Sequence, residues 1–259
     1  MYANTNGYIE RIGEEMRLIQ TIPHIYHQYL LDINAEGQKN IDPLKYRMSS
    51  GHSCFLKQQY ARQGVKKVQS AKDMRNMRVG TLVGDDLERA VELKREVLEK
   101  DGRLFIQEEV SLYGDKVVGH LDIAFFHNAD GVLEVIDEKT VKSWNWKYIF
   151  GKDAYDKKGY IFQLISYAHG LMEKYPELEV KSIVLHNLYW RKGDGELKEL
   201  SINYRKYKNE ALQYWEDCFM LEGEELTAGD DYGCPQQSWE CNYCDYSWQC
   251  PSPFKKGKR

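Results

Sequence analysis

Apolar and polar residues follow two different periods along the chain, and the change between them locates the predicted strands and helices. A period of two residues, in segments rich in Val, Ile, Leu and Phe, is typical of half-buried strands. Strands are predicted at 103–113, 116–127, 132–140, 181–190 and 197–203. Asn128-Ala129-Asp130-Gly131 is a turn-forming stretch between the second and third of them, so these two strands are expected to form a hairpin.

Apolar residues spaced three and four positions apart predict helices. These helices are expected at 8–33, 49–63, 80–100, 160–175 and 205–222. Pro23 is expected to break the first helix, because proline lacks the backbone N–H that a helix interior requires. The order of helix, three strands, helix and strand predicts an α/β (α+β) fold in which a mixed central sheet is flanked by helices.

Composition narrows the class of protein. A chain of 259 residues with 42% hydrophobic residues fits one large domain or a domain with appendages. No apolar run approaches the roughly 20 residues that span a bilayer, and the N-terminus lacks the order of a signal peptide. A cytoplasmic protein without a membrane partner is therefore expected, in which the six cysteines are thiols or metal ligands rather than disulfides.

The predicted hairpin carries charged residues that could perform chemistry. Asp122 lies on its first strand and Asp137-Glu138-Lys139 on its second. Residues two apart in a strand share a face, so Asp137 and Lys139 point the same way and Glu138 points away. Two carboxylates and an amine near one another suit a divalent cation and a phosphate. The alternative is an ordinary solvated strand face.

The predicted helix at 160–175 carries Gln163 and Tyr167, four residues apart and therefore on one face. Gly119-x-x-Asp122, Asp137-x-Lys139 and Gln163-x-x-x-Tyr167, in this order, resemble the signature of the PD-(D/E)XK nuclease superfamily, in its RecB-like branch. The resemblance implies a restriction-endonuclease-like sheet and a Mg²⁺ or Mn²⁺ site.

That resemblance also assigns roles to the residues of the signature. Asp122, Asp137 and the backbone carbonyl of Glu138 would hold the metal. Lys139 would orient the attacking water and stabilise charge on the phosphate, and Gln163 and Tyr167 would support the site and the DNA.

One position departs from the RecB-like pattern. The helix histidine that joins the metal shell in that branch is replaced by Gly84. Asp85 is expected to supply an oxygen instead, and Glu88, one helical turn on, is an alternative. His120 is expected to be a structural or DNA-facing residue.

The cysteines form a second candidate site. Cys241-x2-Cys244-x5-Cys250 is a closely spaced thiolate trio that suits a soft metal or an iron-sulfur cluster. Cys54 or Cys234 would supply the fourth ligand. The layout resembles that of iron-sulfur RecB-like nucleases of the CRISPR-associated Cas-four type and AddB type, which implies a 4Fe-4S cluster on Cys54 and the trio. A Zn²⁺ site that includes Cys234 is the alternative.

Between the hairpin and the helix at 160–175 lies an aromatic and basic loop. Lys142, Trp144, Trp146 and Lys147 are its candidate DNA-binding residues, because aromatic rings stack on unpaired bases and lysines follow phosphates. The alternative is a lid whose aromatic residues pack onto the core.

These features predict three regions: a helical N-terminal region at 1–78, a nuclease core at 79–203, and a C-terminal helix with a cysteine-rich tail at 204–259. The predicted function is Mg²⁺- or Mn²⁺-dependent exonuclease cleavage of single-stranded DNA or DNA ends. Protein partners would belong to recombination or CRISPR adaptation. The alternatives are a weakly catalytic or non-catalytic DNA-end binding subunit and a zinc-binding interaction protein.

Overall fold

The computed structural model describes residues 18–39, 42–67, 69–229 and 238–254. The chain divides into two compact units, one of Met1–Asp42 with Gln69–Met77 and one of Pro43–Val68 with Arg78–Arg259. In the first unit, helix α1 (Leu18–Lys39) runs through position 23. The prediction of a break at Pro23 was wrong, because α1 continues from Leu18 to Lys39 although proline removes one bond of the helical ladder and crowds the turn before it.

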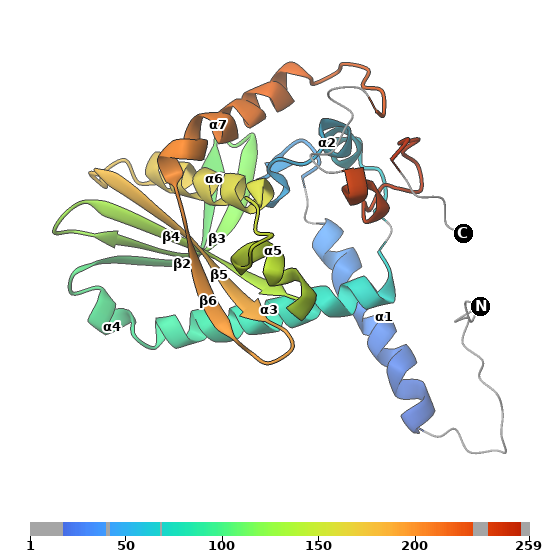
Figure 1. Ribbon diagram of the computed structural model, residues 1–259, viewed down its shortest axis with the longest axis horizontal. Coiled ribbons are helices and arrows are strands. Elements are labelled where there is room, and N and C mark those ends of the chain that lie inside the picture. The colour runs from blue at the N-terminus through green and yellow to red at the C-terminus, as the bar shows by residue number, and fades with distance from the viewer. Residues whose placement is uncertain (1–17, 40–41, 68, 230–237, 255–259) are drawn as a thin grey trace. The chain divides into compact units, whose positions relative to one another are not determined.

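A six-stranded mixed sheet forms the centre of the second unit (Figure 1). Its strands are β1 (Tyr46–Arg47), β2 (Gly102–Leu112), β3 (Val117–His127), β4 (Val132–Val141), β5 (Ser182–Arg191) and β6 (Leu197–Ile202). The path runs β1-β3-β4-β5-β6, and β2 pairs with β3. The β1–β3 and β4–β5 pairs are parallel, and the others are antiparallel.

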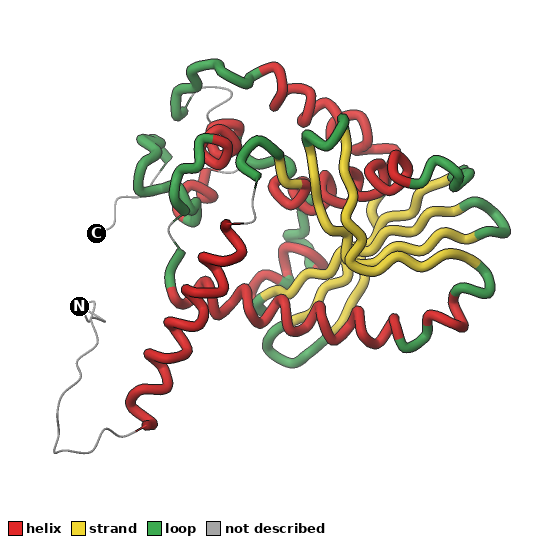
Figure 2. The backbone as a smooth tube through the Cα atoms, turned by 180° about the vertical axis from the view of Figure 1, so that it is seen from behind, coloured by secondary structure: helices red, strands yellow, loops and turns green. Residues whose placement is uncertain are grey.

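Helices cover both faces of this sheet, as Figures 1 and 2 show. Helices α6 (Lys158–Lys174) and α7 (Tyr204–Met220) lie over one face, and α3 (Ala71–Glu92) with α4 (Arg95–Leu98) follows the other. Leu133 of β4, Ile165 of α6 and Trp215 of α7 are fully buried in one hydrophobic core cluster. The predicted mixed sheet flanked by helices is therefore confirmed.

Shorter elements connect these layers. They are η1 (Met48–Ser50), α2 (Phe55–Arg62), η2 (Ser143–Asn145), α5 (Lys147–Phe150) and η3 (Ser238–Asn242). All five longer strands were predicted to within two residues of their observed ends. Helix α3, predicted from residue 80, begins instead at Ala71, where the Ser70 hydroxyl accepts a hydrogen bond from the Asp73 backbone N–H at 3.2 Å.

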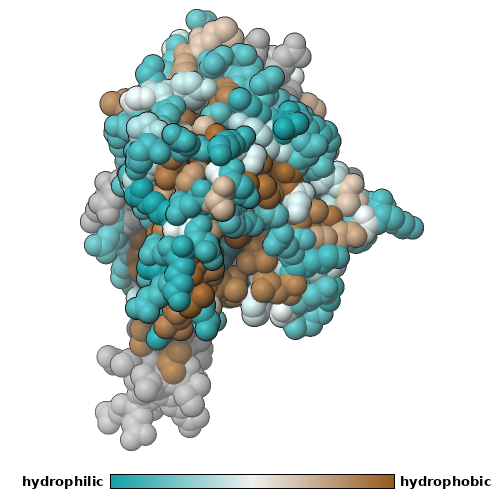
Figure 3. All heavy atoms as spheres, turned by 90° about the vertical axis from the view of Figure 1, so that its left-hand side faces the viewer, coloured by the Kyte–Doolittle hydropathy of each residue, from teal (hydrophilic) through white to brown (hydrophobic). Residues whose placement is uncertain are grey.

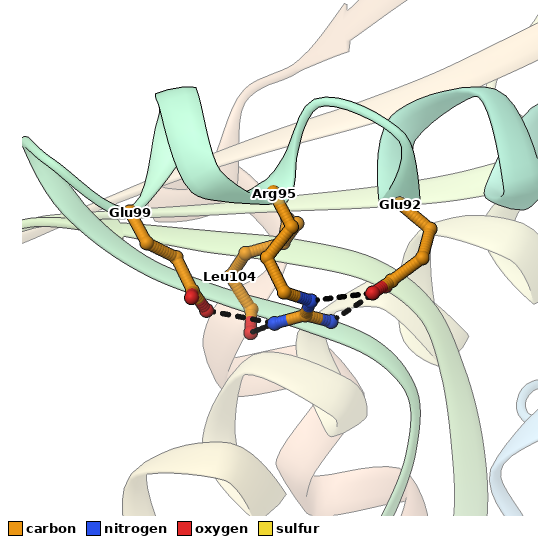
Figure 4. Close-up of polar contacts among 4 residues, drawn as sticks. All are labelled: Glu92, Arg95, Glu99 and Leu104. Carbon is orange, nitrogen blue, oxygen red and sulfur yellow. Dashed lines mark hydrogen bonds and ion pairs between the residues drawn. The ribbon is translucent and has the colours of Figure 1, made fainter.

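A salt-bridge cluster joins the end of α3 to α4 and β2 (Figure 4). The Arg95 guanidinium lies 2.8 Å from Glu92 and 2.7 Å from Glu99, and it donates a hydrogen bond to the Leu104 carbonyl at 3.1 Å. The Glu92 contact, followed by the Glu99 contact, raises the Arg95 pKa. One side chain therefore links the two helical segments to the strand that follows them.

The outer surface contains both hydrophilic and hydrophobic residues. The side of the molecule seen in Figure 3 is mostly hydrophilic and is interrupted by hydrophobic patches. Leu82 on α3 and Leu93 after it are more than half exposed. Among the described helices, none has the length and apolar character that crossing a membrane requires.

A chain of charged residues crosses the sheet away from the hairpin acids. His186 Nε2 on β5 lies 3.2 Å from Glu134 on β4. Its Nδ1 lies 2.6 Å from Glu199 and 3.2 Å from the Ser201 hydroxyl, both on β6. Glu134 also contacts His127 at 3.3 Å. The bond to Glu134 raises the His186 pKa against the opposing effect of burial, and Glu199 adds to the rise.

We expect this chain of charges to make stability depend on pH. Because the folded-state pKa of His186 is raised, its stabilising effect is complete below its unfolded pKa and is lost as pH rises through the folded value. The loss should be about 1 kcal/mol. Urea unfolding between pH 5.5 and 8.5 should show a steeper fall in the free energy of unfolding for the wild type than for His186→Gln, in which the contributions of other groups remain. An exposed-histidine control, His120→Gln, should keep the wild-type slope, and an unchanged slope in His186→Gln would contradict the assignment.

Candidate active site

The site lies where β3 and β4 separate. Their ladder runs from His127↔Val132 to Ile123↔Ile136 and ends there. On the same edge β3 is next paired at Val117 and Val118, by β1. The intervening residues 119–122 have no strand beside them on this edge, while β4 continues along β5 to Val141. Asp122 and Asp137 are the first residues beyond the last β3–β4 pair, so they face the opening between the strands.

Three of the predicted residues meet at this opening. The Asp122 carboxylate accepts a hydrogen bond from the Glu138 backbone N–H at 2.7 Å. On the other side, Lys139 Nζ lies 2.5 Å from Asp137 Oδ2. Asp137 and Lys139 share a face, as the strand alternation predicted. The sheet thus brings an amine and two carboxylates together at one point.

Burial makes the site electrostatically unusual. Asp137 is 0% exposed, and burial raises its pKa to about 7, although Lys139 opposes the shift. The pKa of Glu138 is raised to about 8 by burial and by the Asp122, Glu88 and Asp137 carboxylates. Burial tends to lower the Lys139 pKa, but the Asp137 and Asp122 carboxylates outweigh it and raise that pKa.

Glu138 points away from Asp137 toward α3. A Cβ atom added at Gly84 would lie 3.2 Å from Glu138 Oε2. The absence of a side chain at position 84 therefore gives the Glu138 carboxylate room to lie against the helix. Asp85 is exposed on the helix surface, whereas Glu88 is partly buried. Burial raises the Glu88 pKa, and the Asp122 carboxylate raises it further.

Helix α6 places Gln163 and Tyr167 near the acids of the β3–β4 opening. Gln163 and Tyr167 are both buried, and Gln163 Nε2 donates a hydrogen bond to the Tyr167 hydroxyl at 2.6 Å. Burial raises the Tyr167 pKa, and the Asp137 carboxylate adds to that rise. A Cβ atom at Gly119 would lie only 2.8 Å from the Tyr167 ring, so glycine at this position lets the ring approach β3.

The donor set fits a hard divalent cation. Asp137 Oδ2 is paired with Lys139 Nζ at 2.5 Å, whereas Asp137 Oδ1 and both side-chain oxygens of the partly buried Glu138 accept no hydrogen bond from a described residue. Buried carboxylates without such partners are stabilised by a positive charge, and oxygen donors are those that Mg²⁺ and Mn²⁺ prefer. The described side chains include no group of three or more His, Cys, Asp or Glu residues arranged to hold a metal ion. The agreement of this site with a divalent cation therefore rests on the oxygen donors that it offers and on their charge.

A groove of about 950 Å³ begins at the end of β4, one residue beyond Lys139. Its walls include Thr140 and Lys142, the aromatic loop, the start of α6 and the C-terminal segment. Cys54, Cys241, Cys244 and Cys250 all line it. The structure thus brings the four predicted cysteines, from distant parts of the sequence, to one groove.

The cysteines differ in their surroundings. Burial raises the Cys54 pKa to about 11, and the nearby Cys250 and Cys244 thiols contribute. Cys241 Sγ lies 3.1 Å from the Ser252 hydroxyl. Cys234, the other candidate for the fourth ligand, lies outside the described residues. Thiol sulfur is the donor type that iron-sulfur clusters and zinc take, but the described thiols do not form a closed ligand set.

The aromatic loop divides into two parts. Trp144 is 60% exposed and lines the groove beside Lys142. Trp146 instead packs 4.6 Å from Phe150, with the Arg191 guanidinium over its ring. Lys147 is exposed and does not line the groove. The packing interpretation thus applies to Trp146, whereas DNA binding by Lys142 and Trp144 stays a prediction.

Other groove residues were not identified from the sequence. Trp239 and Tyr243, in and after η3, line the groove, as does Lys192 after β5. These residues lie far from the aromatic loop in the sequence, so no periodic pattern of residues linked them to the loop. The aromatic residues Trp239 and Tyr243 and the basic residue Lys192 were themselves the available signs.

Comparisons with known proteins agree with this geometry. The sequence model of a family described as the PD-(D/E)XK nuclease superfamily matches residues 55–251. A solved structure titled "Crystal structure of SSO0001" is similar in fold, with a TM-score of 0.52 and 17% sequence identity. The match covers 89% of this chain and 96% of that chain. No curated protein matches the sequence.

Proposed function

Because the chain belongs to the PD-(D/E)XK nuclease superfamily, we propose that it is a Mg²⁺- or Mn²⁺-dependent DNA exonuclease of the RecB-like branch. The observation that carries the proposal is the fully buried Asp137, which shares the β3–β4 opening with Asp122 and contacts Lys139 at 2.5 Å. This is the arrangement of acids and amine that metal-assisted hydrolysis of a phosphodiester requires.

The residues of the β3–β4 opening have different proposed roles. Asp122, Asp137 and the Glu138 backbone carbonyl would hold a divalent cation, which would supply an activated water and offset phosphate charge. The Lys139 ammonium is held against Asp137 and stabilises negative charge that develops on the phosphate. Tyr167 and Gln163 keep the α6 side of the site in place through their hydrogen bond.

We propose that the substrate is an unpaired strand. The groove that starts beside Lys139 is lined by aromatic rings at Trp144, Trp239 and Tyr243 and by Lys142 and other lysines. Aromatic rings stack on bases of any sequence, and lysines neutralise phosphates, which together suit single-stranded DNA. A duplex end would have to open before its strand entered.

Loss of the Trp144 ring is expected to weaken binding of single-stranded DNA. Base–aromatic stacking contributes about 1–3 kcal/mol per base, so Trp144→Ala should raise the dissociation constant by about 10-fold. Fluorescence anisotropy with a labelled oligonucleotide in Ca²⁺ measures it. Trp248→Ala is the matched control, because Trp248 is exposed but does not line the groove. Equal losses in both variants would contradict a stacking role for Trp144.

We further propose that Cys54, Cys241, Cys244 and Cys250 hold a structural 4Fe-4S cluster. Support comes from their common place in the groove and from the close spacing of the last three. Zn²⁺ is the alternative metal for the same thiols.

The decisive experiment is digestion of single-stranded DNA labelled at one end, with Mg²⁺, with Mn²⁺ and with a chelator. Progressive shortening that requires the metal supports the exonuclease. Binding without cleavage supports instead a DNA-end binding subunit that works with recombination or CRISPR-adaptation proteins. The glycine at position 84, in place of the histidine of RecB-like members, favours testing that second candidate. Absence of both binding and cleavage would refute the proposal.

A further inference from the structure

Strand β5 carries two buried polar side chains next to the charged residues of the site. The parallel ladder between β4 and β5 pairs Asp137 with Asn187 and Lys139 with Tyr189. Directly paired residues of neighbouring strands point to the same face, and their Cα atoms lie about 5 Å apart. Asn187 is 1% exposed and Tyr189 is 0% exposed. Both side chains therefore lie inside the protein, beside the carboxylate and the amine of the opening.

The polar pairs follow an apolar part of the same ladder. Earlier on this face the pairs join apolar residues that belong to the core or pack against it, Leu133 with Ile183 and Val135 with Leu185. The next pair is Asp137 with Asn187. A buried asparagine costs free energy unless its amide is hydrogen-bonded. Packing against the core therefore does not explain why β5 has an asparagine at this position.

Three polar groups at this place find no hydrogen-bond partner within the described part of the chain. They are the side-chain amide of Asn187, the Tyr189 hydroxyl and Asp137 Oδ1. Burial raises the Tyr189 pKa, and the Tyr160 phenol and the Asp137 carboxylate raise it further, so the Tyr189 hydroxyl lies near Asp137. The three groups are complementary, because an amide and a hydroxyl can donate and a carboxylate oxygen accepts. Buried polar groups in proteins are almost always hydrogen-bonded, to protein atoms or to an ordered water.

We propose that one buried water joins Asn187, Tyr189 and Asp137 Oδ1, and that Asn187 and Tyr189 are positioning residues for Asp137. The proposal rests on the proposed metal-dependent nuclease function. A buried water makes about three hydrogen bonds: this one accepts from the amide and the hydroxyl and donates to Asp137 Oδ1. Lys139 holds Asp137 Oδ2 at 2.5 Å. The carboxylate is thereby oriented at both oxygens, and outer partners of this kind strengthen the binding of a metal by the carboxylate they hold.

The test is binding of Mn²⁺ to the full chain without DNA, measured by titration calorimetry, together with the melting temperature of the metal-free protein. Asn187→Leu keeps the volume of the side chain and removes its amide, so the Mn²⁺ dissociation constant should rise about 10-fold. Tyr189→Phe removes one partner of the water and should raise it about threefold. The metal-free melting temperature of both variants should stay within about 3 °C of wild type, because an apolar group replaces a polar group of similar shape.

Matched variants separate the hydrogen bond from packing. The Tyr246 hydroxyl is also buried and without a partner among the described residues, but it belongs to the C-terminal segment, so Tyr246→Phe should keep the wild-type Mn²⁺ affinity. Asn187→Ser and Asn187→Ala leave nearly the same space and differ by one hydroxyl, which can donate to the water in place of the amide. Asn187→Ser should therefore bind Mn²⁺ at least about threefold more tightly than Asn187→Ala.

The outcomes separate this proposal from the one on which it rests. Wild-type affinity in Asn187→Leu, together with loss of binding in Asp137→Asn, overturns the positioning role alone. A wild type that binds no Mn²⁺, or wild-type affinity in Asp137→Asn, overturns the metal site and this proposal with it. If Asn187→Leu loses affinity and melting temperature together, equal affinities of Asn187→Ser and Asn187→Ala overturn the proposal and a tighter Asn187→Ser supports it. Equal affinities of Tyr189→Phe and Tyr246→Phe overturn the role of Tyr189.

Discussion

Asp137→Ala and Lys139→Ala are each expected to lower the rate of DNA cleavage by at least about 10³-fold. Asp137 is a fully buried carboxylate at the β3–β4 opening, and Lys139 is the cation that lies 2.5 Å from it. On the proposed function, Asp137→Ala takes away a proposed metal ligand, and Lys139→Ala takes away the charge stabilisation proposed at the phosphate. Single-turnover digestion of end-labelled single-stranded DNA with Mn²⁺ measures both losses.

Matched variants show whether the loss is specific. Asp194→Ala breaks an exposed ion pair with Arg191 in the β5–β6 turn, and Lys116→Ala removes an exposed lysine before β3. Both should cleave at the wild-type rate. Binding of the oligonucleotide in Ca²⁺ should stay within a few-fold of wild type in Lys139→Ala. Equal cleavage by wild type, Asp137→Ala and Lys139→Ala would show that the nuclease assignment is wrong.

The hairpin and its acids could be predicted because the information is local. Alternation along 132–140 fixes which residues share a face, and the turn at 128–131 fixes which strand is the neighbour. The positions of Asp137 and Lys139 followed from these two rules. The pair Gln163 and Tyr167 followed from helical spacing in the same way.

The surroundings of the acids could not be predicted, because they depend on contacts between distant segments. The helix was predicted to begin at residue 80, which placed Gly80 and Gly84 at its N-terminal end. In the fold, α3 continues through both, and a Cβ atom there would lie 3.2 Å from Thr140 and from Glu138 respectively. Close packing against β4 thus explains glycine inside the helix, where the prediction placed its start.

Cys54→Ser is expected to remove the cluster and to destabilise the fold. Anaerobically purified wild type should be brown, with about four iron and four sulfide per chain. Cys54 precedes α2, whereas the other three cysteines follow the nuclease core, so a cluster on all four closes a very long loop. On the chain-entropy scale such a link contributes about 4–5 kcal/mol, so the melting temperature of Cys54→Ser should fall by about 10 °C.

Two further variants decide which thiols are ligands. Cys218→Ala is the control, because Cys218 is a buried thiol of α7 whose pKa burial raises to about 12, and it should keep its iron. Cys234→Ser tests the other candidate for the fourth ligand. Loss of iron in Cys234→Ser but not in Cys54→Ser would move the cluster to the C-terminal segment alone. It could then no longer link that segment to α2, and the large loss of stability in Cys54→Ser would not be observed. A colourless wild type with one zinc per chain would replace the cluster with a zinc site on these thiols.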